Sequence, residues 1–238
     1  MKVIILAAGM GSRLKPLTNH MPKTMITVGN QTMIENIIQG LVDLQLSVMA
    51  IITGYQHEVL ERFLRRRFPK VRLQFIYNDQ YSVKDNIYSF SLAEEYVGNE
   101  EMLCICSDIY CEPKLLLRAV QAPFDILMVD DKKEIPSGAM KVSVDRNGFI
   151  TKISKKLMVE ESMGEIVGIS KISASNTAFI FERVATFLDR GIVNVWWPYA
   201  INDVLDQIKL RPWSTDGIGW VNVNTFDDLN EAMNIAIY

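Results

Sequence analysis

The chain has 238 residues, enough for one domain whose core needs no disulfide or metal to hold it. Hydrophobic residues at 49% and charged residues at 22% are typical of globular proteins and exclude a disordered, collagenous or coiled-coil chain. A net charge of −3 argues against a nucleic-acid binder, and an odd count of three cysteines favours a reducing, cytoplasmic location.

The first half of the chain alternates apolar runs with amphipathic stretches. Short apolar runs predict four buried strands, at Lys2–Ala7, Val48–Thr53, Val71–Tyr77 and Met102–Ser107. Apolar residues at helical spacing predict three helices, at Met33–Leu46, Glu58–Phe68 and Ile87–Tyr96. This order predicts an α/β fold with a Rossmann-like, mostly parallel sheet flanked by helices. No apolar run approaches the length of a membrane span, so we expect no membrane partner.

The second half has a different pattern. Met140–Val144 and Phe149–Ser154 flank a turn and predict an antiparallel hairpin insertion that covers the substrate cleft. The polar stretch from Lys155 to Lys171 is expected to cover or border the same cleft. A strand at Trp220–Val223 and a helix at Asp227–Ile237 are expected to close the fold.

A glycine turn, Gly9-Met10-Gly11-Ser12-Arg13, follows the first strand directly. Glycine permits unusual dihedrals and close approach, so this turn is suited to cradle a phosphate with its backbone amides, although a plain tight turn is the alternative. A dinucleotide fingerprint needs a small residue at the position of Leu14, and a P-loop needs Gly-Lys-Ser/Thr at its end. Both are missing, which leaves a glycine loop followed by two cations, Arg13 and Lys23.

These residues carry a resemblance to a known family. Gly9-x-Gly11-Ser12-Arg13-Leu14-x-Pro16-Leu17-Thr18, followed by Pro22-Lys23-x-Met25, resembles the signature of nucleotidyltransferases, which join a nucleoside triphosphate to a phosphorylated small molecule. Within that family, the segments Asn78–Ser89, Trp196-Trp197 and Trp220–Thr225 look like those of CTP:phosphocholine and 2-aminoethylphosphonate cytidylyltransferases. The resemblance implies a single domain over residues 1–238, with a nucleotide-binding core at 1–135 and acceptor-binding and closing elements at 136–238.

The resemblance also implies roles for single residues. Arg13, Lys23 and Asp108 would be catalytic, and Asp108 and Asn224 would hold Mg²⁺. Asn224 stands where members of the family usually carry an acid, and a neutral amide oxygen weakens a metal site. The residues expected to bind the nucleotide are Leu6, Ala7, Ala8, Gly9, Gly11, Ser12, Arg13, Lys23, Asn86 and Ser89.

The acceptor would meet Lys155, Glu165, Trp196 and Trp197. Lys152 and Lys156 compete with Lys155 for the acceptor phosphate. Adjacent tryptophans offer ring faces to an ammonium group, or else pack in the core. Glu165, like Glu161, could add a negative charge for the same cation, or be a solvated surface acid.

The chemistry agrees with the resemblance. An acceptor phosphate is already an anionic nucleophile near neutral pH, so its attack on the α-phosphorus needs no general base, and the chain has only two histidines. Transfer then depends on positioning and on charge stabilisation by Mg²⁺ and cations. We expect transfer of CMP from CTP to a small phosphorylated or phosphonylated amino-alcohol-like acceptor, phosphocholine first and 2-aminoethylphosphonate second, with release of pyrophosphate. The alternatives are a sugar-1-phosphate nucleotidyltransferase and an inactive nucleotide-binding regulatory module, which Asn224 favours.

Overall fold

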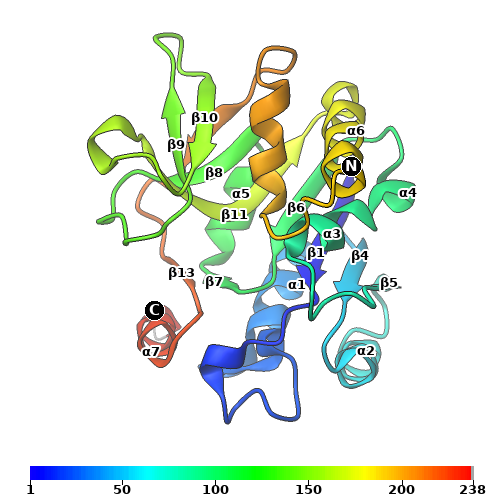
Figure 1. Cartoon of the computed structure of the whole chain (residues 1–238). Coiled ribbons are helices and arrows are strands. Elements are labelled where there is room, and N and C mark those ends of the chain that lie inside the picture. Colours follow the sequence, from blue (N-terminus) through cyan, green and yellow to red (C-terminus); the bar gives the residue numbers. More distant parts are fainter. Residues whose placement is uncertain (237–238) are drawn as a thin grey trace.

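A central mixed sheet organises the computed structural model, which describes residues 1–236 (Figure 1). Its strands follow the order β10-β9-β11-β6-β1-β4-β5, while β8 pairs with β11 and β12 pairs with β8. The strands of this sheet are β1 Lys2–Ala7, β4 Val48–Thr53, β5 Arg72–Tyr77, β6 Met102–Cys106, β8 Ile126–Asp130, β9 Lys141–Val144, β10 Ile150–Ser154, β11 Gly164–Ile172 and β12 Arg211–Ser214. Two small ribbons lie off the main sheet: β2 Thr27–Val28 with β3 Gln31–Thr32, and β7 Ile109–Cys111 with β13 Trp220–Asn222.

Helices cover both faces of this sheet because its central strands are apolar on both sides. In β1, Val3 and Ile5 pack with α1, α2 and α5, whereas Ile4 and Leu6 pack with α3, α4 and α6. The helices are α1 Met33–Asp43, α2 His57–Arg67, α3 Asn86–Ser91, α4 Glu94–Val97, α5 Pro113–Val120, α6 Ala174–Asp189 and α7 Phe226–Ile235. The predicted α/β class, with a mostly parallel sheet flanked by helices, is confirmed.

The carboxyl ends of the parallel strands meet at one edge of the sheet. Strands β6, β1, β4 and β5 run parallel to one another, so the loops after β1 and β6 open on the same side. Ligands of open α/β sheets bind in the crevice beyond such strand ends. The β9–β10 hairpin, antiparallel as predicted, lies at the top of Figure 1, and α7 lies at the bottom left.

Several element boundaries differ from the prediction. Helix α1 ends at Asp43 rather than Leu46, because Gln45 adopts a left-handed φ of 63°. The helix predicted over Ile87–Tyr96 is interrupted between α3 and α4 by a turn, in which the Ala93 amide donates to the Phe90 carbonyl. The closing helix was predicted to reach Ile237, which lies outside the described residues.

The largest difference concerns the polar stretch from Lys155 to Lys171. It holds β11, a nine-residue strand that pairs antiparallel with β6 and β8 in the middle of the sheet. A bulge between Ile166 and Ser170 breaks the alternation of buried and open positions, which hides the strand pattern. Gly168 sits in the bulge with φ of 90°, and a Cβ there would lie 3.1 Å from the Cys106 Cβ. The bulge therefore brings the β11 backbone close against the end of β6.

Candidate active site

The glycine turn leaves β1 at the carboxyl edge of the sheet and packs against Lys23. Gly11 has a φ of 64°, and a Cβ on it would lie 2.7 Å from the Cβ of Lys23. A side chain at this position would therefore be strained and would also displace the lysine. The Thr18 hydroxyl donates to the Gly11 carbonyl at 2.9 Å and fixes the turn from the other side.

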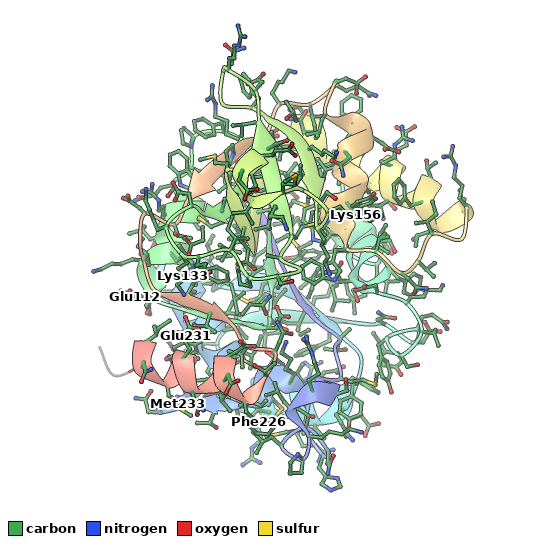
Figure 2. The ribbon with its side chains drawn as sticks, turned by 60° about the vertical axis from the view of Figure 1, so that its left-hand side comes forward. Glu112, Lys133, Lys156, Phe226, Glu231 and Met233 are labelled. Carbon is green, nitrogen blue, oxygen red and sulfur yellow. The ribbon has the colours of Figure 1, made fainter. Side chains whose placement is uncertain are left out.

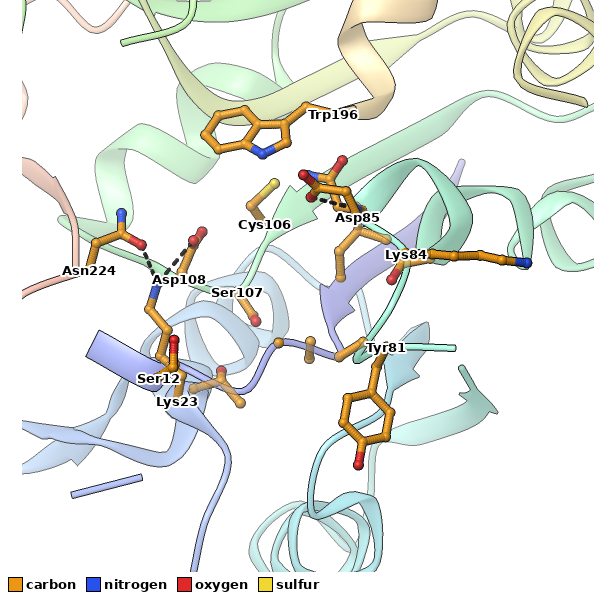
Figure 3. A pocket seen from close by; sticks show the side chains of 18 of the residues that line it. Ser12, Lys23, Tyr81, Lys84, Asp85, Cys106, Ser107, Asp108, Trp196 and Asn224 are labelled. Carbon is orange, nitrogen blue, oxygen red and sulfur yellow. Dashed lines mark hydrogen bonds and ion pairs between the residues drawn. The ribbon is translucent and has the colours of Figure 1, made fainter. Parts of the chain in front are cut away.

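Two side chains from distant segments, Asp108 and Asn224, converge on the ammonium of Lys23. Lys23 Nζ donates to Asp108 Oδ2 at 3.1 Å and to Asn224 Oδ1 at 2.8 Å (Figure 3). Arg13 Nη2 donates to the same Asn224 oxygen at 2.8 Å. Lys23 is only 8% exposed, so these charge-assisted contacts form in a partly desolvated place, where electrostatic interactions are stronger than in open water.

The backbone explains why Asp108 and Asn224 meet. Asp108 directly precedes β7, Asn224 follows β13 by one residue, and the two strands pair antiparallel with Asn222 opposite Ile109. The Val223 amide also donates to the Asp108 carbonyl at 2.8 Å. Thr225 begins α7 with a capping box, and Asp228 accepts from the Asn224 amide. Asp108 and Asn224, which are 116 positions apart in the chain, are thereby held at one point.

A cavity of about 280 Å³ opens beside this cluster, and we call it the glycine-loop cavity. All ten residues predicted to bind the nucleotide line it, from Leu6 to Ser89, together with Asp108 and Asn224. Figure 3 shows Lys23, Asp108 and Asn224 at one side of this cavity and Tyr81 and Lys84 at the other. The structure thus brings together every residue of the predicted nucleotide site.

The two adjacent tryptophans have different surroundings. Trp197 is 2% exposed and stacks on Phe90, with ring centroids 4.2 Å apart and planes at 7°. Its ring is part of the core, which corrects its assignment to the acceptor. Trp196 is half-buried and lines the glycine-loop cavity and three adjoining hollows. The Asn86 side chain accepts from the Trp197 amide at 2.9 Å, so it also positions this segment.

Lys155 lies directly over Trp196. Its Nζ is 4.2 Å from the centroid of the indole ring, a cation–π contact. Lys155 and Lys156 both line a cavity of about 190 Å³ beside Trp196 and Tyr199, which we call the Lys155 cavity. Lys152, the third candidate for the acceptor phosphate, is exposed on β10 and lines none of the cavities described here.

Glu165 lies in a larger hollow of about 650 Å³, which Arg13, Lys155, Trp196 and Asn224 also line. Burial, and next the nearby Asp130 carboxylate, raise the pKa of Glu165 to about 7. Glu165 is therefore only partly ionised near neutral pH. Lys133, which also lines this hollow, binds Glu231 of α7 at 2.9 Å (Figure 2).

Sequence reasoning missed some residues of the cavity wall. Tyr81, Lys84 and Asp85 come from the loop before α3, and Cys106 and Ser107 come from the end of β6. The first three lie in the segment Asn78–Ser89 that carried the resemblance, but within that segment only Asn86 and Ser89 were assigned to the site. Burial and the Asp108 charge raise the pKa of the Cys106 thiol, which keeps it protonated.

The oxygens around Lys23 are suited to a divalent cation. Asp108 Oδ2 and Asn224 Oδ1 converge on a single point, which the lysine ammonium contacts, and Asn222 Oδ1 lies beside Asn224. One carboxylate with amide oxygens is a hard donor set that fits Mg²⁺. Within residues 1–236 no group of three His, Cys, Asp or Glu side chains is arranged to hold a metal. Substrate phosphate oxygens and water would therefore have to complete the coordination shell.

A glycine loop beside an acid, at the carboxyl edge of parallel strands, lies where open α/β sheets bind their ligands. The model of the nucleotidyl transferase family matches residues 2–156, more than half of the chain, and the chain belongs to that family. Among the residues that the structure describes, no helix is long and apolar enough to cross a membrane.

Relatives with known names extend over most of the chain. It is 37% identical over 245 residues to a choline-phosphate cytidylyltransferase of Streptococcus pneumoniae, which covers 99% of this chain and 98% of the relative. It is 27% identical over 212 residues to a 2-aminoethylphosphonate cytidylyltransferase of Lancefieldella rimae, covering 87% and 81%. A mannose-1-phosphate guanyltransferase of Gibberella zeae is 26% identical over 219 residues, covering 91% of this chain and 54% of the relative.

Solved structures share the fold. The CTP:phosphocholine cytidylyltransferase of Streptococcus pneumoniae superposes with a TM-score of 0.81 over 98% of each chain, at 23% identity. The chain is thus a nucleotidyltransferase similar to cytidylyltransferases, with relatives that act on sugar phosphates as well.

Proposed function

We propose that this protein is a Mg²⁺-dependent cytidylyltransferase. It transfers CMP from CTP to a small phosphorylated or phosphonylated amino-alcohol-like acceptor and releases pyrophosphate. Phosphocholine is the first acceptor that we would test and 2-aminoethylphosphonate is the second. The names of two relatives that cover most of the chain support this choice.

One observation supports it most directly. Lys155 and Trp196 form an adjoining pair, a cation beside an aromatic ring, next to the cavity that the glycine loop and Lys23 line. A phosphate or phosphonate needs a cation, and an ammonium group is attracted to a ring face. The acceptor proposed here carries both groups.

The residues would share the work of transfer. An oxygen of the acceptor phosphate attacks the α-phosphorus of CTP, the bond from that phosphorus to the bridging oxygen breaks, and pyrophosphate leaves. Lys23 and Arg13 meet the negative charge that grows on the phosphates, and Lys155 directs the acceptor. The glycine loop, which lacks side chains at Gly9 and Gly11, lets its backbone approach the triphosphate closely.

Asp108 and Asn224 would hold Mg²⁺, which when bound neutralises phosphate charge and orients the triphosphate. The single carboxylate makes this a weak site for a metal alone. Lys23, which now contacts both oxygens, would then turn to the phosphates of CTP.

A pyrophosphate-release screen tests the proposal. It crosses CTP, UTP, GTP and ATP with phosphocholine, 2-aminoethylphosphonate, phosphoethanolamine and glucose 1-phosphate, each with and without Mg²⁺. We expect release with CTP and an amino-alcohol acceptor only, and only with Mg²⁺. Release with a sugar phosphate alone would instead support the second candidate, a sugar-1-phosphate nucleotidyltransferase, which the guanyltransferase relative favours. CTP binding without release for any pair would support an inactive nucleotide-binding module.

A further inference from the structure

Asp85 joins the glycine-loop cavity to the Lys155 cavity, since it lines both. Trp196 is the only other residue shared by these two walls among residues 1–236. Figure 3 shows Asp85 on the side of the glycine-loop cavity that Trp196 borders. Asp85 thus lies at the junction of the two cavities.

The carboxylate of Asp85 is held in position but is not neutralised. The Asp85 amide donates to the Val193 carbonyl at 2.9 Å, and Oδ1 accepts from the Asn86 amide at 2.7 Å. Within residues 1–236, Oδ2 accepts no hydrogen bond from protein and no Lys, Arg or His lies within ion-pair distance of Asp85. A fixed, exposed carboxylate with one free oxygen is ready to pair with a ligand cation.

The neighbouring cations are arranged to meet an anion instead. Lys155 and Lys156 belong to the same cavity as Asp85, but neither pairs with it. Lys155 is held over the Trp196 ring, and its carbonyl accepts from the buried Lys141 ammonium at 2.9 Å. The Lys155 cavity therefore carries positive groups and a separate negative group, with an indole ring between the two cavities.

We propose that Asp85 binds the ammonium group of the acceptor, and that it selects an acceptor that is a zwitterion. Lys155 and Lys156 bind the phosphate or phosphonate of the acceptor, and Asp85 binds its ammonium group. Trp196 lies beside the carbon chain of the acceptor that joins these two groups. This assignment rests on the proposed function, because it names the acceptor of that same site. Asp85 is a binding residue that determines specificity and takes no part in bond making.

Glu165, the acid expected from the sequence to meet this cation, is less suited to it. Lys133 and Lys141 lie close enough to lower its pKa, while burial and Asp130 raise it. Its charge is thus partly lost to protonation near neutral pH and partly matched by its own neighbours. By contrast, no protein cation pairs with Asp85 within the described residues.

The variant Asp85→Asn tests the assignment cleanly. Asparagine is as good a helix N-cap as aspartate, so the start of α3 is preserved while the charge is removed. Asp79→Asn is the matched control: it makes the same change in the same loop, at an exposed residue that lines none of the cavities described here. The KM for CTP and the KM for the acceptor are measured for both, with phosphocholine and with 2-aminoethylphosphonate. 2-Hydroxyethylphosphonate, which lacks the ammonium, is measured as a competitive inhibitor.

We expect Asp85→Asn to raise the acceptor KM at least tenfold, because a charge-assisted contact is lost. The KM for CTP and the inhibition constant of 2-hydroxyethylphosphonate should stay within twofold of the wild-type values. The thermal midpoint should stay within about 2 °C of that of the wild type. An unchanged acceptor KM in Asp85→Asn would overturn the assignment. So would an equal loss of affinity for the ammonium acceptor and for 2-hydroxyethylphosphonate, or an equal rise of the acceptor KM in Asp79→Asn. If the wild-type protein uses no ammonium acceptor at all, the proposed function fails first, and the two failures are thereby distinguished.

Discussion

At the scale of single residues, Asp108 combines two separable roles. Its backbone carbonyl accepts from the Val223 amide and joins β7 to β13, whereas its side chain forms a hydrogen bond and ion pair only with Lys23 among the described residues. The first role belongs to the fold and survives any substitution by another L-residue. The second role belongs to the site, so mutation of the side chain should separate chemistry from stability.

We therefore expect Asp108→Ala to lower kcat by about a thousandfold or more, since a metal and charge-stabilising group at the transferring phosphorus is removed. Circular dichroism and the thermal midpoint should show a folded protein. Asp227→Ala, at an exposed acid in the first turn of α7, is a control for the loss of one negative charge nearby. A folded Asp108→Ala protein with near-normal turnover at saturating Mg²⁺ would remove Asp108 from the mechanism.

Glu165 provides a pH-dependent prediction. Its pKa is about 7 in the folded protein against 4.5 for a free side chain, chiefly because of burial and then because of Asp130, with Lys133 and Lys141 acting the other way. The folded state therefore binds the proton more tightly than the unfolded chain between those values. The contribution of Glu165 to the free energy of unfolding is fully present below about pH 4.5 and is lost as pH rises through about 7.

Glu165→Gln should remove this dependence. The difference in thermal midpoint, Glu165→Gln minus wild type, should be more positive at pH 8 than at pH 5. The reason is that only the wild type bears a desolvated carboxylate at this position at pH 8. Glu160→Gln, at an exposed position, gives the background effect of the same substitution. Parallel midpoint curves for Glu165→Gln and the wild type from pH 5 to 8 would contradict a raised pKa.

At the scale of elements, the segment Val193–Trp197 is attached to the start of α3. Three hydrogen bonds from backbone amides hold it. The Asp85 amide donates to the Val193 carbonyl and the Ile87 amide donates to the Val195 carbonyl. The Trp197 amide donates to the side-chain oxygen of Asn86. Trp197 then inserts against Phe90, which itself stacks on Phe181 of α6. Trp196, the residue before Trp197, lines the cavities.

Opposite effects are expected from replacing the two tryptophans. Trp197→Leu should lower stability by roughly 1–3 kcal/mol, because it removes a buried stacked ring. Trp196→Leu should leave the midpoint nearly unchanged and raise the acceptor KM by up to about thirtyfold, the value of a lost cation–π contact of ~0.5–2 kcal/mol. Thermal midpoints and both KM values for each variant make the comparison. A selective loss of acceptor binding in Trp197→Leu would reverse the assignments.

The elements also show what the sequence reveals and what it hides. Strands β1 and β4 were predicted to the residue, because buried parallel strands are continuous apolar runs with clear ends. Strand β11 was missed, because Gly164, Glu165 and Gly168 interrupt its pattern at a bulge. Helix α6 was missed although Ile180, Phe181, Val184 and Phe187 follow helical spacing, a signal that was available.

The residues of the candidate site can also be divided into those that the sequence revealed and those that it hid. The resemblance led from the glycine loop to Lys23, Asp108 and Asn224, and the structure brings these residues together. Their roles in catalysis and in binding the nucleotide remain predictions. Asp85 was missed because its position in the cavity depends on Val193–Trp197 docking on α3, a long-range contact that no local pattern encodes. Trp197 and Trp196 could not be told apart, because their neighbours Phe90 and Lys155 are far away in the sequence.

At the scale of the whole molecule, the site is assembled from both ends of the chain. Lys23 follows the first strand, Asp108 precedes β7, and Asn224 lies between β13 and α7. The Lys23 ammonium contacts both oxygens that are suited to a metal. A metal alone must therefore displace a cation from a site with one carboxylate, whereas CTP gives that cation a new partner.

Metal and nucleotide should consequently bind together and stabilise the fold together. A ligand at 100 times its Kd adds about 2.7 kcal/mol, which corresponds to a rise of roughly 5–10 °C in the midpoint of a protein of this size. We expect such a rise with CTP and Mg²⁺ together, and at most about 2 °C with Mg²⁺ alone. Removal of the metal by a chelator should abolish most of the rise.

Two variants show whether the Lys23 ammonium is the cause of the weak stabilisation by Mg²⁺ alone. Lys23→Met keeps the aliphatic stem beside Gly11 but removes the ammonium, so Mg²⁺ alone should raise its midpoint more than that of the wild type. Asn224→Asp adds a second carboxylate and should have the same effect, since Mg²⁺ prefers charged oxygen ligands. Arg190→Met, at an exposed cation that contacts neither oxygen, should respond to Mg²⁺ as the wild type does. If Mg²⁺ alone stabilises the wild type as strongly as Lys23→Met, the lysine does not compete with the metal, and the coupling of metal to nucleotide must have another origin.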